Sequence, residues 1–307
     1  MNGPTPLAVA GNVNVDLIMG PVAPWPMPGT EVMVPHDDLR VGGAAGNTAL
    51  AWQALDVPFQ FAANIGSDMF GHWLAGAFPA YASSWPFSPR RTTVSVGLTH
   101  PDGERTFFTT DGHLRDMEAE ASLAALDVAA LSGGILLLTG AFVTDALADD
   151  YSRVFDRADA HGIDVALDTG WPVQGWTPET KAKARGWLAR SKFALMNEVE
   201  TAALTEIDDI HQAAAALRHA MPKGALVVVK RGAEGALALD AVATHRASAK
   251  AVTVIDTIGA GDIFNAGFLA AHARGLGLPD ALQAGVAIAS VAISTHPRRF
   301  LQEDLTE

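Results

Sequence analysis

Short apolar runs alternate with longer stretches that carry apolar residues at helical spacing along most of the chain. The short runs have the length of buried strands, and the longer stretches have the length and periodicity of helices. The predicted strands are LAVAG (7–11), FQFAANI (59–65), ILLLTG (135–140), IDVALD (163–168), FALMN (193–197) and ALVVVK (225–230). The predicted helices cover 44–56, 68–80, 145–161, 178–190, 209–220, 261–275 and 279–294. Apolar strands separated by helices indicate an α/β fold with a mostly parallel sheet covered on both faces.

Other stretches show the alternation of strands that are polar on one face. In VNVDLIM (13–19), Asn14 and Asp16 share one face, and apolar residues share the other. In TTVSVGLTHPDGERTFFTT (92–110), two alternating runs flank the sequence PDGE, which predicts a hairpin. Together with TEVMVPHDDL (30–39), these runs predict a small antiparallel sheet beside the main one.

Composition and charge exclude several classes of protein. Of the 307 residues, 49% are hydrophobic and 18% are charged, which is typical of a globular chain with a large core. The net charge of −13 argues against nucleic acid as a partner. The absence of cysteine excludes disulfides, thiolate metal sites and a cysteine nucleophile. The N-terminus has no basic signal-peptide region, and apolar runs are too short to span a membrane, so we expect a cytoplasmic protein without a membrane partner.

The segment DTIGAGDIFNAGF carries the most specific chemistry of the sequence. It places Asp262 directly behind the small turn Gly259-Ala260-Gly261, and the apolar residues that follow predict a helix beginning at this turn. Free N–H groups and the positive end of the helix dipole attract anions such as phosphate at a helix N-terminus. Packing alone does not explain small residues and acids at a helix entry. We therefore expect an anion site with a carboxylate beside it.

Three other segments combine glycine or polar residues with predicted strand ends. VGGAAGN is a glycine-rich turn entering a helix, which close backbone packing would account for equally well. LMNEVE places Asn197 and Glu200 three residues apart, which is also the spacing of a capping box. VKRGAEG holds Gly232 and Gly235 in a turn that also suits an ordinary hairpin. The dinucleotide-binding, P-loop, zincin and hydrolase motifs do not occur in the sequence.

Taken together, the segments GNVNVDL, VGGAAGN, IGSDMFG, LMNEVE, VKRGAEG and DTIGAGD resemble, in this order, the ribokinase-like PfkB family of carbohydrate kinases. The resemblance spans about residues 7 to 294. It implies a Rossmann-like three-layer α/β/α core with a mostly parallel sheet and a small β-sheet lid. We expect one kinase domain over residues 1–307, with the lid formed from about 13–40 and 91–111. The implied reaction transfers the γ-phosphoryl group of ATP to a hydroxymethyl group.

The resemblance implies separate roles for the backbone amides and the carboxyl of this segment. The amides of Gly259, Ala260 and Gly261 would form an anion hole for the charge on the transferring phosphoryl group. Asp262 would accept the proton of the attacking hydroxyl. The carboxylate would then face the sugar while the backbone faces ATP.

The other motifs match binding positions of the family. The implied substrate-binding residues are Asn14, Asp16, Gly42, Gly43 and Asn47. The implied ATP-binding residues are Asn197, Lys230, Gly232, Gly235 and Gly261. Asn197 and Glu200 match the element that organises Mg²⁺ and the phosphates, mostly through water. Asp256 and the backbone of Ile258 match a site for K⁺.

Some positions depart from the family pattern. LDTGWPVQGW (167–176) stands where many relatives carry an Asp-Pro-Asn element, and Gly285 stands in place of an asparagine that borders the adenine. Ala44 stands where ribokinases proper have lysine, which argues against ribose. STHPRRF lacks the glycine-containing loop of the cation site, which leaves the dependence on K⁺ open.

Three functions therefore stay open. The first is an ATP-dependent kinase of a sugar or sugar acid, and the second is a nucleoside kinase, with an aromatic slot from Trp25, Trp171 or Trp176. The third is a non-catalytic sugar-binding regulator on the same fold.

Charge near the expected acceptor pocket narrows the class of sugar that the first function would use. Ala44 and Ala45 follow the double glycine, and Asp16 adds negative charge, so only lid arginines would compensate a second phosphate. Those arginines are Arg40, Arg90, Arg91 and Arg105. We therefore expect an unphosphorylated sugar as substrate. The alternating lid strands would expose an apolar face and sheet edges, which predicts a homodimer through the lid.

Overall fold

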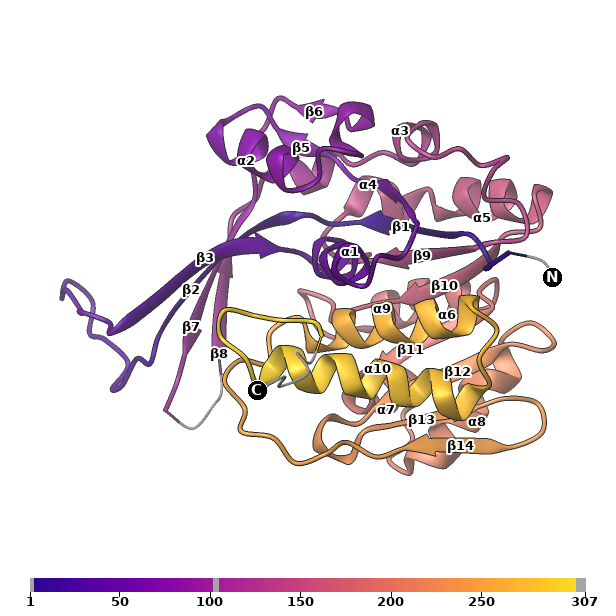
Figure 1. The fold of residues 1–307 in the computed structure, drawn as a ribbon. Helices are drawn as coiled ribbons and strands as arrows, with labels where there is room; N and C mark the ends of the chain where they lie inside the picture. Colours follow the sequence, from indigo (N-terminus) through magenta and orange to yellow (C-terminus); the bar gives the residue numbers. More distant parts are fainter. Residues whose placement is uncertain (1–2, 102–104, 302–307) are drawn as a thin grey trace, which may run out of the picture.

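The computed structural model describes residues 3–101 and 105–301, and its largest sheet has the strand order β14-β13-β12-β11-β10-β9-β1-β4 (Figure 1). These strands are β1 (Leu7–Gly11), β4 (Gln60–Ala62), β9 (Ile135–Thr139), β10 (Asp164–Asp168), β11 (Phe193–Asn197), β12 (Leu226–Lys230), β13 (Ala236–Leu239) and β14 (Thr244–Ala247). The strands from β4 to β12 pair in parallel, and β13 and β14 extend the sheet as antiparallel strands. The predicted mostly parallel sheet is confirmed.

Helices cover both faces of this sheet (Figure 1). One face carries α1 (Ala44–Ala54), α9 (Ala260–Ala273) and α10 (Leu278–Ile293). The opposite face carries α3 (Ala119–Ala124), α4 (Asp145–Asp149), α5 (Tyr151–Ala160), α6 (Pro178–Leu188), α7 (Glu198–Thr205) and α8 (Ile210–Ala220). Alternate residues of one strand enter the two cores, since Leu7 and Val9 pack on the first face and Ala8 and Ala10 on the second. The three-layer α/β/α architecture is therefore confirmed.

Two predicted elements are divided in the structure. The run 59–65 forms β4 and the short β5 (Ile65–Gly66), which pairs with β6 (Phe87–Ser88) beside α2 (Met69–Ala77). Asn64 interrupts the run because its buried side chain donates a hydrogen bond to the His113 carbonyl at 2.7 Å. The stretch 145–161 forms α4 and α5, which are separated at Asp150.

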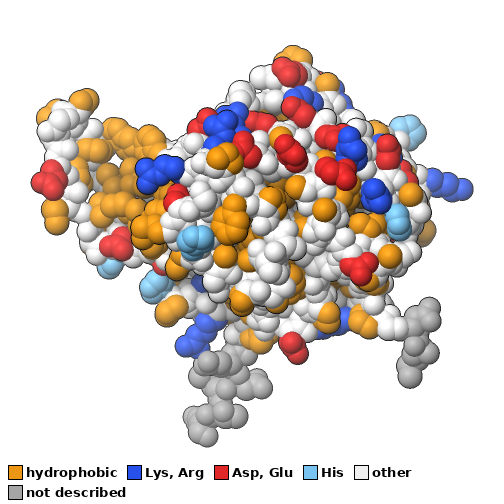
Figure 2. Space-filling view, turned by 90° about the horizontal axis from the view of Figure 1, so that it is seen from above, with side chains coloured by type: hydrophobic (Ala, Val, Ile, Leu, Met, Phe, Trp, Pro, Cys, Tyr) orange, Lys and Arg blue, Asp and Glu red, His pale blue; other side chains and the backbone are white. Residues whose placement is uncertain are grey.

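A second sheet projects from the core at the left of Figure 1 and has the order β3-β2-β7-β8. Its strands are β2 (Asn14–Gly20), β3 (His36–Gly42), β7 (Val94–Thr99) and β8 (Arg105–Thr109). Hydrophobic side chains gather on this projection, where Leu39, Phe107 and Phe108 are exposed (Figure 2). The β7–β8 hairpin confirms the predicted pair of strands, although turn residues 102–104 lie outside the described part of the chain.

Two details of the predicted small sheet were wrong. β2 and β7 pair in parallel, because the chain passes through β3, α1 and the edge of the core between them. The strand predicted at 30–39 lies instead at His36–Gly42. Pro35 explains the shift, because proline cannot donate to a strand ladder and commonly marks the beginning of a strand.

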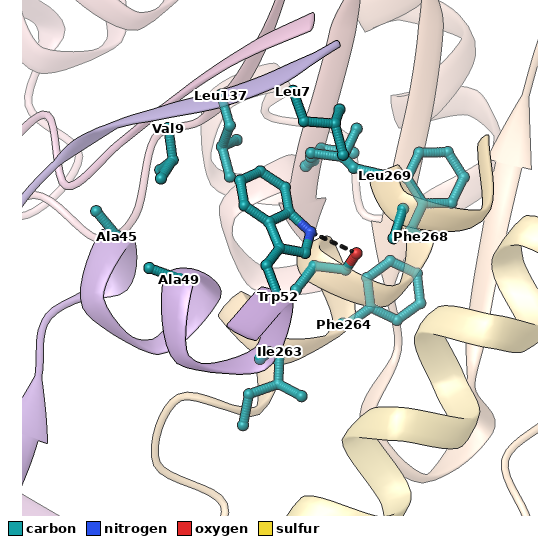
Figure 3. Packing of buried hydrophobic residues seen from close by; sticks show 14 of the residues in the cluster. Leu7, Val9, Ala45, Ala49, Trp52, Leu137, Ile263, Phe264, Phe268 and Leu269 are labelled. Atoms are coloured by element: carbon teal, nitrogen blue, oxygen red, sulfur yellow. Dashed lines mark hydrogen bonds between the residues drawn. The ribbon is translucent and has the colours of Figure 1, made fainter. Parts of the chain in front are cut away.

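The buried indole of Trp52 fixes α1 against α9. Its Nε1 donates a hydrogen bond to the Ala266 carbonyl at 3.0 Å, and its ring lies among Leu7, Phe264 and other core residues (Figure 3). The contact places the beginning of α9, with the predicted anion turn, beside the beginning of α1. Within the described ranges, no helix is both long and apolar enough to cross a membrane.

Candidate active site

The carboxyl ends of the parallel strands meet at one edge of the main sheet. Gly11, Thr139 and Asp168 are paired across three strands, and Asn197 is paired with Lys230 across two others. In open α/β sheets, ligands bind beyond this edge. Most of the sequence-predicted residues lie in three places near this edge: at the beginning of α9, around Asp16 and around Lys230.

The turn that is expected to bind an anion, Gly259-Ala260-Gly261, lies at the beginning of α9. Gly259 is the N-cap residue and has φ 76°, a conformation that favours glycine. A Cβ at this position would lie 2.6 Å from Nδ2 of Asn47. Within residues 3–101 and 105–301, the amides of Gly259 and Gly261 have no hydrogen-bond partner, whereas the Ala260 amide donates to the Thr257 carbonyl at 3.1 Å. Two of the three expected donors are therefore free in the ligand-free turn.

Asp262 is held in place by residues of α1. Nδ2 of Asn47 donates a hydrogen bond to its Oδ2 at 2.9 Å, and Oγ1 of Thr48 donates to its backbone carbonyl at 3.2 Å. Burial raises the pKa of Asp262 to about 7, and the nearby negative charge of Asp168 adds to the effect. A carboxyl with a pKa near neutral pH is well suited to proton transfer.

The first cluster of predicted substrate residues surrounds Asp16. Nδ2 of Asn14 donates a hydrogen bond to Oδ1 of Asp16 at 2.7 Å. A Cβ on Gly42 would lie 2.1 Å from Cγ of Asp16, so only glycine fits there. Gly43 has φ 87° and approaches the Asn12 carbonyl. Burial raises the pKa of Asp16 to about 6, while the charge of Arg40 opposes the increase.

The second cluster lies on the other side of the turn, around Lys230. Its Nζ is 2.6 Å from Oδ2 of Asp168, which also accepts a hydrogen bond from Nδ2 of Asn265 at 2.6 Å. Burial works against the charge of Lys230, but Asp168 and Glu200 outweigh it and raise the pKa of the ammonium group. A Cβ on Gly261 would lie 3.3 Å from Nζ of Lys230, so the lysine is adjacent to the anion-binding turn.

Asn197 and Glu200 form the capping box that their spacing also predicted. The Asn197 side chain accepts from the Glu200 amide at 2.8 Å, and the Glu200 side chain accepts from the Asn197 amide at 2.9 Å. Burial and the charge of Asp168 raise the pKa of Glu200 to about 7. Across the described residues, no group of three or more acidic or histidine side chains could hold a metal directly. The side chains of Asn197 and Glu200 fit an Mg²⁺ ion that is bound mainly by phosphate and water, which is its usual mode in kinases.

Gly232 and Gly235 lie in the hairpin between β12 and β13. Gly235 has φ 88°, and a Cβ there would lie 2.0 Å from the Ala247 carbonyl oxygen, so this glycine is required by packing. Gly232 has φ 53°, and a Cβ there would meet only open space. The hairpin interpretation is confirmed, and only Gly232 leaves room for a neighbouring molecule.

The residues expected to bind K⁺ have another cationic partner. Nη2 of Arg298 lies 2.8 Å from Oδ2 of Asp256 and 2.7 Å from the Ile258 carbonyl oxygen. Nη1 of Arg40 lies 2.6 Å from the same Oδ2. Because two guanidinium groups occupy this position, it does not fit a potassium ion.

Sequence reasoning missed three residues of this site. Asp168 ends an apolar strand at the ligand-binding edge, a position that could have identified it. Asn265 is a fully buried amide within an apolar helix, which is also a recognisable sequence signal. Arg298 has no such signal, because its contact depends on how the segment after α10 folds back. A surface hollow of about 580 Å³ beside α5, lined by Asp150 and His161 among others, shares no residue with these clusters.

Comparison with known proteins assigns the chain to a family. The model of the pfkB family carbohydrate kinases matches residues 5–303. The chain therefore belongs to the pfkB family of carbohydrate kinases. Its members are phosphotransferases that act on an alcohol group, and this chain is an enzyme of that class.

Relatives agree with this assignment, and a solved structure agrees with the fold. A fructokinase from Rhizobium leguminosarum bv. trifolii is 30% identical over 239 residues, which cover 75% of this chain and 70% of the relative. A 5-dehydro-2-deoxygluconokinase from Bacillus thuringiensis subsp. konkukian is 25% identical and covers 95% of this chain and 92% of its own. The ribokinase of Arabidopsis thaliana, solved with ribose and ATP, has a TM-score of 0.76 at 23% identity and covers 96% of this chain and 94% of its own.

The elevated pKa values generate a stability prediction. The folded-state pKa of Asp262, about 7, lies above its ordinary value of 3.8. The stabilising contribution of this carboxyl is therefore fully present below about 3.8 and is lost as the pH rises through about 7. Asp262→Asn keeps a neutral group at all pH values, so the variant should raise the melting temperature of the ligand-free protein more at pH 8 than at pH 5.

Calorimetry at both pH values measures this difference. Glu31→Gln is the matched control, because it removes a carboxylate that is exposed in the segment between β2 and β3. An equal change for Asp262→Asn at the two pH values would contradict the elevated pKa.

Proposed function

We propose that this chain transfers the γ-phosphoryl group of ATP to a primary hydroxyl of an unphosphorylated sugar or sugar-like molecule. The observation that carries the proposal is the juxtaposition of two free amides, those of Gly259 and Gly261, with the Asp262 carboxyl at the beginning of one helix. The amides suit the charge on a transferring phosphoryl group. The carboxyl suits the proton of the attacking hydroxyl.

Asp262 is the general base of the proposed reaction. Its carboxylate accepts the hydroxyl proton while the sugar oxygen forms a bond to the γ-phosphorus and the bond to the ADP oxygen breaks. The hydrogen bond from Asn47 orients the carboxylate toward the substrate side of the turn. The Gly259 and Gly261 amides, with the adjacent Lys230 ammonium, stabilise the phosphoryl oxygens. Asn197, Gly232 and Gly235 contribute to the proposed nucleotide site.

Mg²⁺ bound with the nucleotide neutralises phosphate charge in such reactions. Glu200 and Asp168 are the carboxylates of this chain that would hold it through water. Both lie close to Lys230, whose charge they share. The capping box keeps the Glu200 side chain in one orientation, which suits a water-mediated contact.

The acceptor pocket supports a substrate without a second phosphate. Asn14 and Asp16 offer an amide and a carboxylate to sugar hydroxyls, with Gly42, Gly43 and Asn47 around them. Each lid arginine has a partner within the protein: Arg40 pairs with Asp38 and Asp256, Arg90 with Asp116, Arg91 with Asp68, and Arg105 with Thr257.

Arg40 is the arginine best placed for an acidic substituent. Its strand position pairs with Asp16, and its Nε and Nη2 are buried without a hydrogen-bond partner in the described chain. A sugar acid would therefore depend on Arg40, whereas a neutral sugar would not. For a nucleoside, the ring of Trp25 packs on His100 and Phe108 of the lid, although about half of this residue is exposed.

The projecting sheet is the proposed site of homodimer formation. Leu39, Phe107 and Phe108 are exposed on its strands, and Met27 and Met33 are exposed in the adjoining segment (Figure 2). Monomeric proteins seldom leave such clusters of apolar side chains and free strand edges uncovered. A second copy of the lid would cover both.

The role of Asp262 predicts a large loss of turnover. Asp262→Asn should lower kcat by about 10²–10⁴, the usual contribution of a positioned general base, and should leave ATP binding intact. In the wild type, kcat/KM should rise with pH up to about 7, because the base acts in its deprotonated form, and should level off above that value. Steady-state kinetics and calorimetric titration with ATP measure both effects. Near-wild-type turnover in the variant would exclude Asp262 as the base.

The pocket predicts the order of substrates. In a coupled ADP-release assay, neutral sugars should give the highest kcat/KM, ahead of sugar acids, nucleosides and 6-phosphosugars. Arg40→Gln should then lower kcat/KM for a sugar acid by about tenfold or more beyond its effect on a neutral sugar, the value of a charge-assisted contact. A preference for phosphosugars would contradict the proposed pocket, and sugar binding without ADP release would favour a regulator.

The lid predicts the oligomeric state. Sedimentation at micromolar concentration should give a dimer, and Leu39→Asp with Phe108→Asp should give a monomer, because both side chains lie on the sheet face opposite Asp16 and charges are costly in an apolar interface. Val242→Asp is the control, since this exposed residue lies in the β13–β14 turn of the main sheet and not in the projecting sheet. A wild-type monomer would contradict the proposal.

A further inference from the structure

A partly buried arginine near the C-terminus contacts the turn that precedes the anion-binding amides. Nη2 of Arg298 donates to Oδ2 of Asp256 at 2.8 Å and to the Ile258 carbonyl at 2.7 Å. Only 15% of the Arg298 side chain is exposed. These two oxygens are the ones that the sequence assigned to K⁺.

The other acceptor positions of the Asp256 carboxylate also have partners. Its Oδ1 accepts a hydrogen bond from the Ile258 amide at 2.8 Å, and its Oδ2 is 2.6 Å from Nη1 of Arg40. A monovalent cation at the same oxygens would displace hydrogen bonds from a guanidinium group and would face two fixed positive charges. The arrangement therefore excludes the ion, and the guanidinium group supplies the positive charge that the ion would have supplied.

The contact with Ile258 reaches the anion hole through one peptide group. The Ile258 carbonyl and the Gly259 amide belong to the same planar peptide, which is trans, so the N–H points away from the carbonyl oxygen. That amide has no partner among the described residues. A positive charge on the carbonyl oxygen fixes the peptide plane and polarises the N–H on its opposite side.

We propose that the Arg298 guanidinium is a permanent internal cation of the anion hole, so that phosphoryl transfer by this chain needs no added monovalent cation. Arg298 is a positioning residue, because it acts through the Ile258–Gly259 peptide and not on the substrate. Burial and the charge of Arg40 lower the pKa of Arg298, but a guanidinium group still stays protonated throughout the physiological pH range. The kinetic test below depends on the proposed kinase function, whereas the ion-binding test depends on the geometry alone.

The ion-binding test compares thermal unfolding of the ligand-free protein in KCl and in choline chloride at equal ionic strength. K⁺ should leave the melting temperature of the wild type unchanged. It should raise that of Arg298→Ala, because removing the guanidinium frees the Ile258 carbonyl oxygen and removes one of the two cationic contacts of Oδ2 of Asp256. Arg274→Ala is the matched control, since it removes an exposed arginine from the far end of α9. Stabilisation of the wild type by K⁺ would overturn the proposal.

The kinetic test uses the same two salts and the sugar that gives the highest kcat/KM. Wild-type kcat should agree in the two salts within about twofold, whereas Arg298→Ala should lose about tenfold or more in choline chloride because the amide is displaced. K⁺ or free guanidinium should restore part of that loss, and Arg298→Lys should retain more activity than Arg298→Ala. K⁺ activation of the wild type, or an Arg298→Ala enzyme that is fully active in choline chloride, would overturn the proposal.

Failures of the two proposals are distinguishable. If no sugar supports turnover, the kinase proposal fails, and the unfolding comparison still decides the role of Arg298. If Arg298→Ala does not fold, the wild-type salt comparisons and Arg298→Lys decide it.

Discussion

The contact between α1 and α9 is the constraint on which the site depends. α1 follows β3, the strand after β2, which carries Asn14 and Asp16, whereas α9 carries Asp262 and begins more than two hundred residues later. The Trp52 hydrogen bond to α9 and the Asn47 bond to Asp262 join these distant parts. Because both bonds join α1 to α9, a shift of either helix would move the Asp262 carboxyl and the turn Gly259-Ala260-Gly261 together away from Asn14 and Asp16.

Buried negative charge is the second organising feature. Burial raises the pKa values of Asp16, Glu200 and Asp262, which means that each ionised carboxylate costs stability in the ligand-free protein. Lys230 compensates Asp168 directly, and Arg40 and Arg298 compensate Asp256. Charge compensation is thus divided: Asp168 and Asp256 have ion-pair partners, whereas Asp16, Glu200 and Asp262 form no ion pair among the described residues. Such a division is typical of sites that trade stability for chemistry.

Much of the fold could be predicted because its signals are local. Apolar runs of strand length identified β1 and β11 at their observed bounds, and helical periodicity identified α1, α9 and α10 to within a few residues. Errors occurred where contacts distant in sequence override the local pattern. The side chain of Asn64 interrupts a predicted strand by bonding the His113 carbonyl, and the parallel β2–β7 pairing depends on the path of the intervening chain.

The sequence by itself determined which residues are expected to carry the chemistry, since small residues at a helix entry followed directly by Asp262 indicate an anion site beside a carboxylate. Only the tertiary structure decided how the charges are paired. Asp168 meets Lys230 across two intervening strand pairings, and Arg298 folds back from beyond α10 to the Ile258 carbonyl. Sequence spacing contains no information on such contacts, because side-chain direction and chain path are set by packing of the whole core. The contact of Arg298 with the turn before Gly259 is therefore a property of the fold and not of the motif.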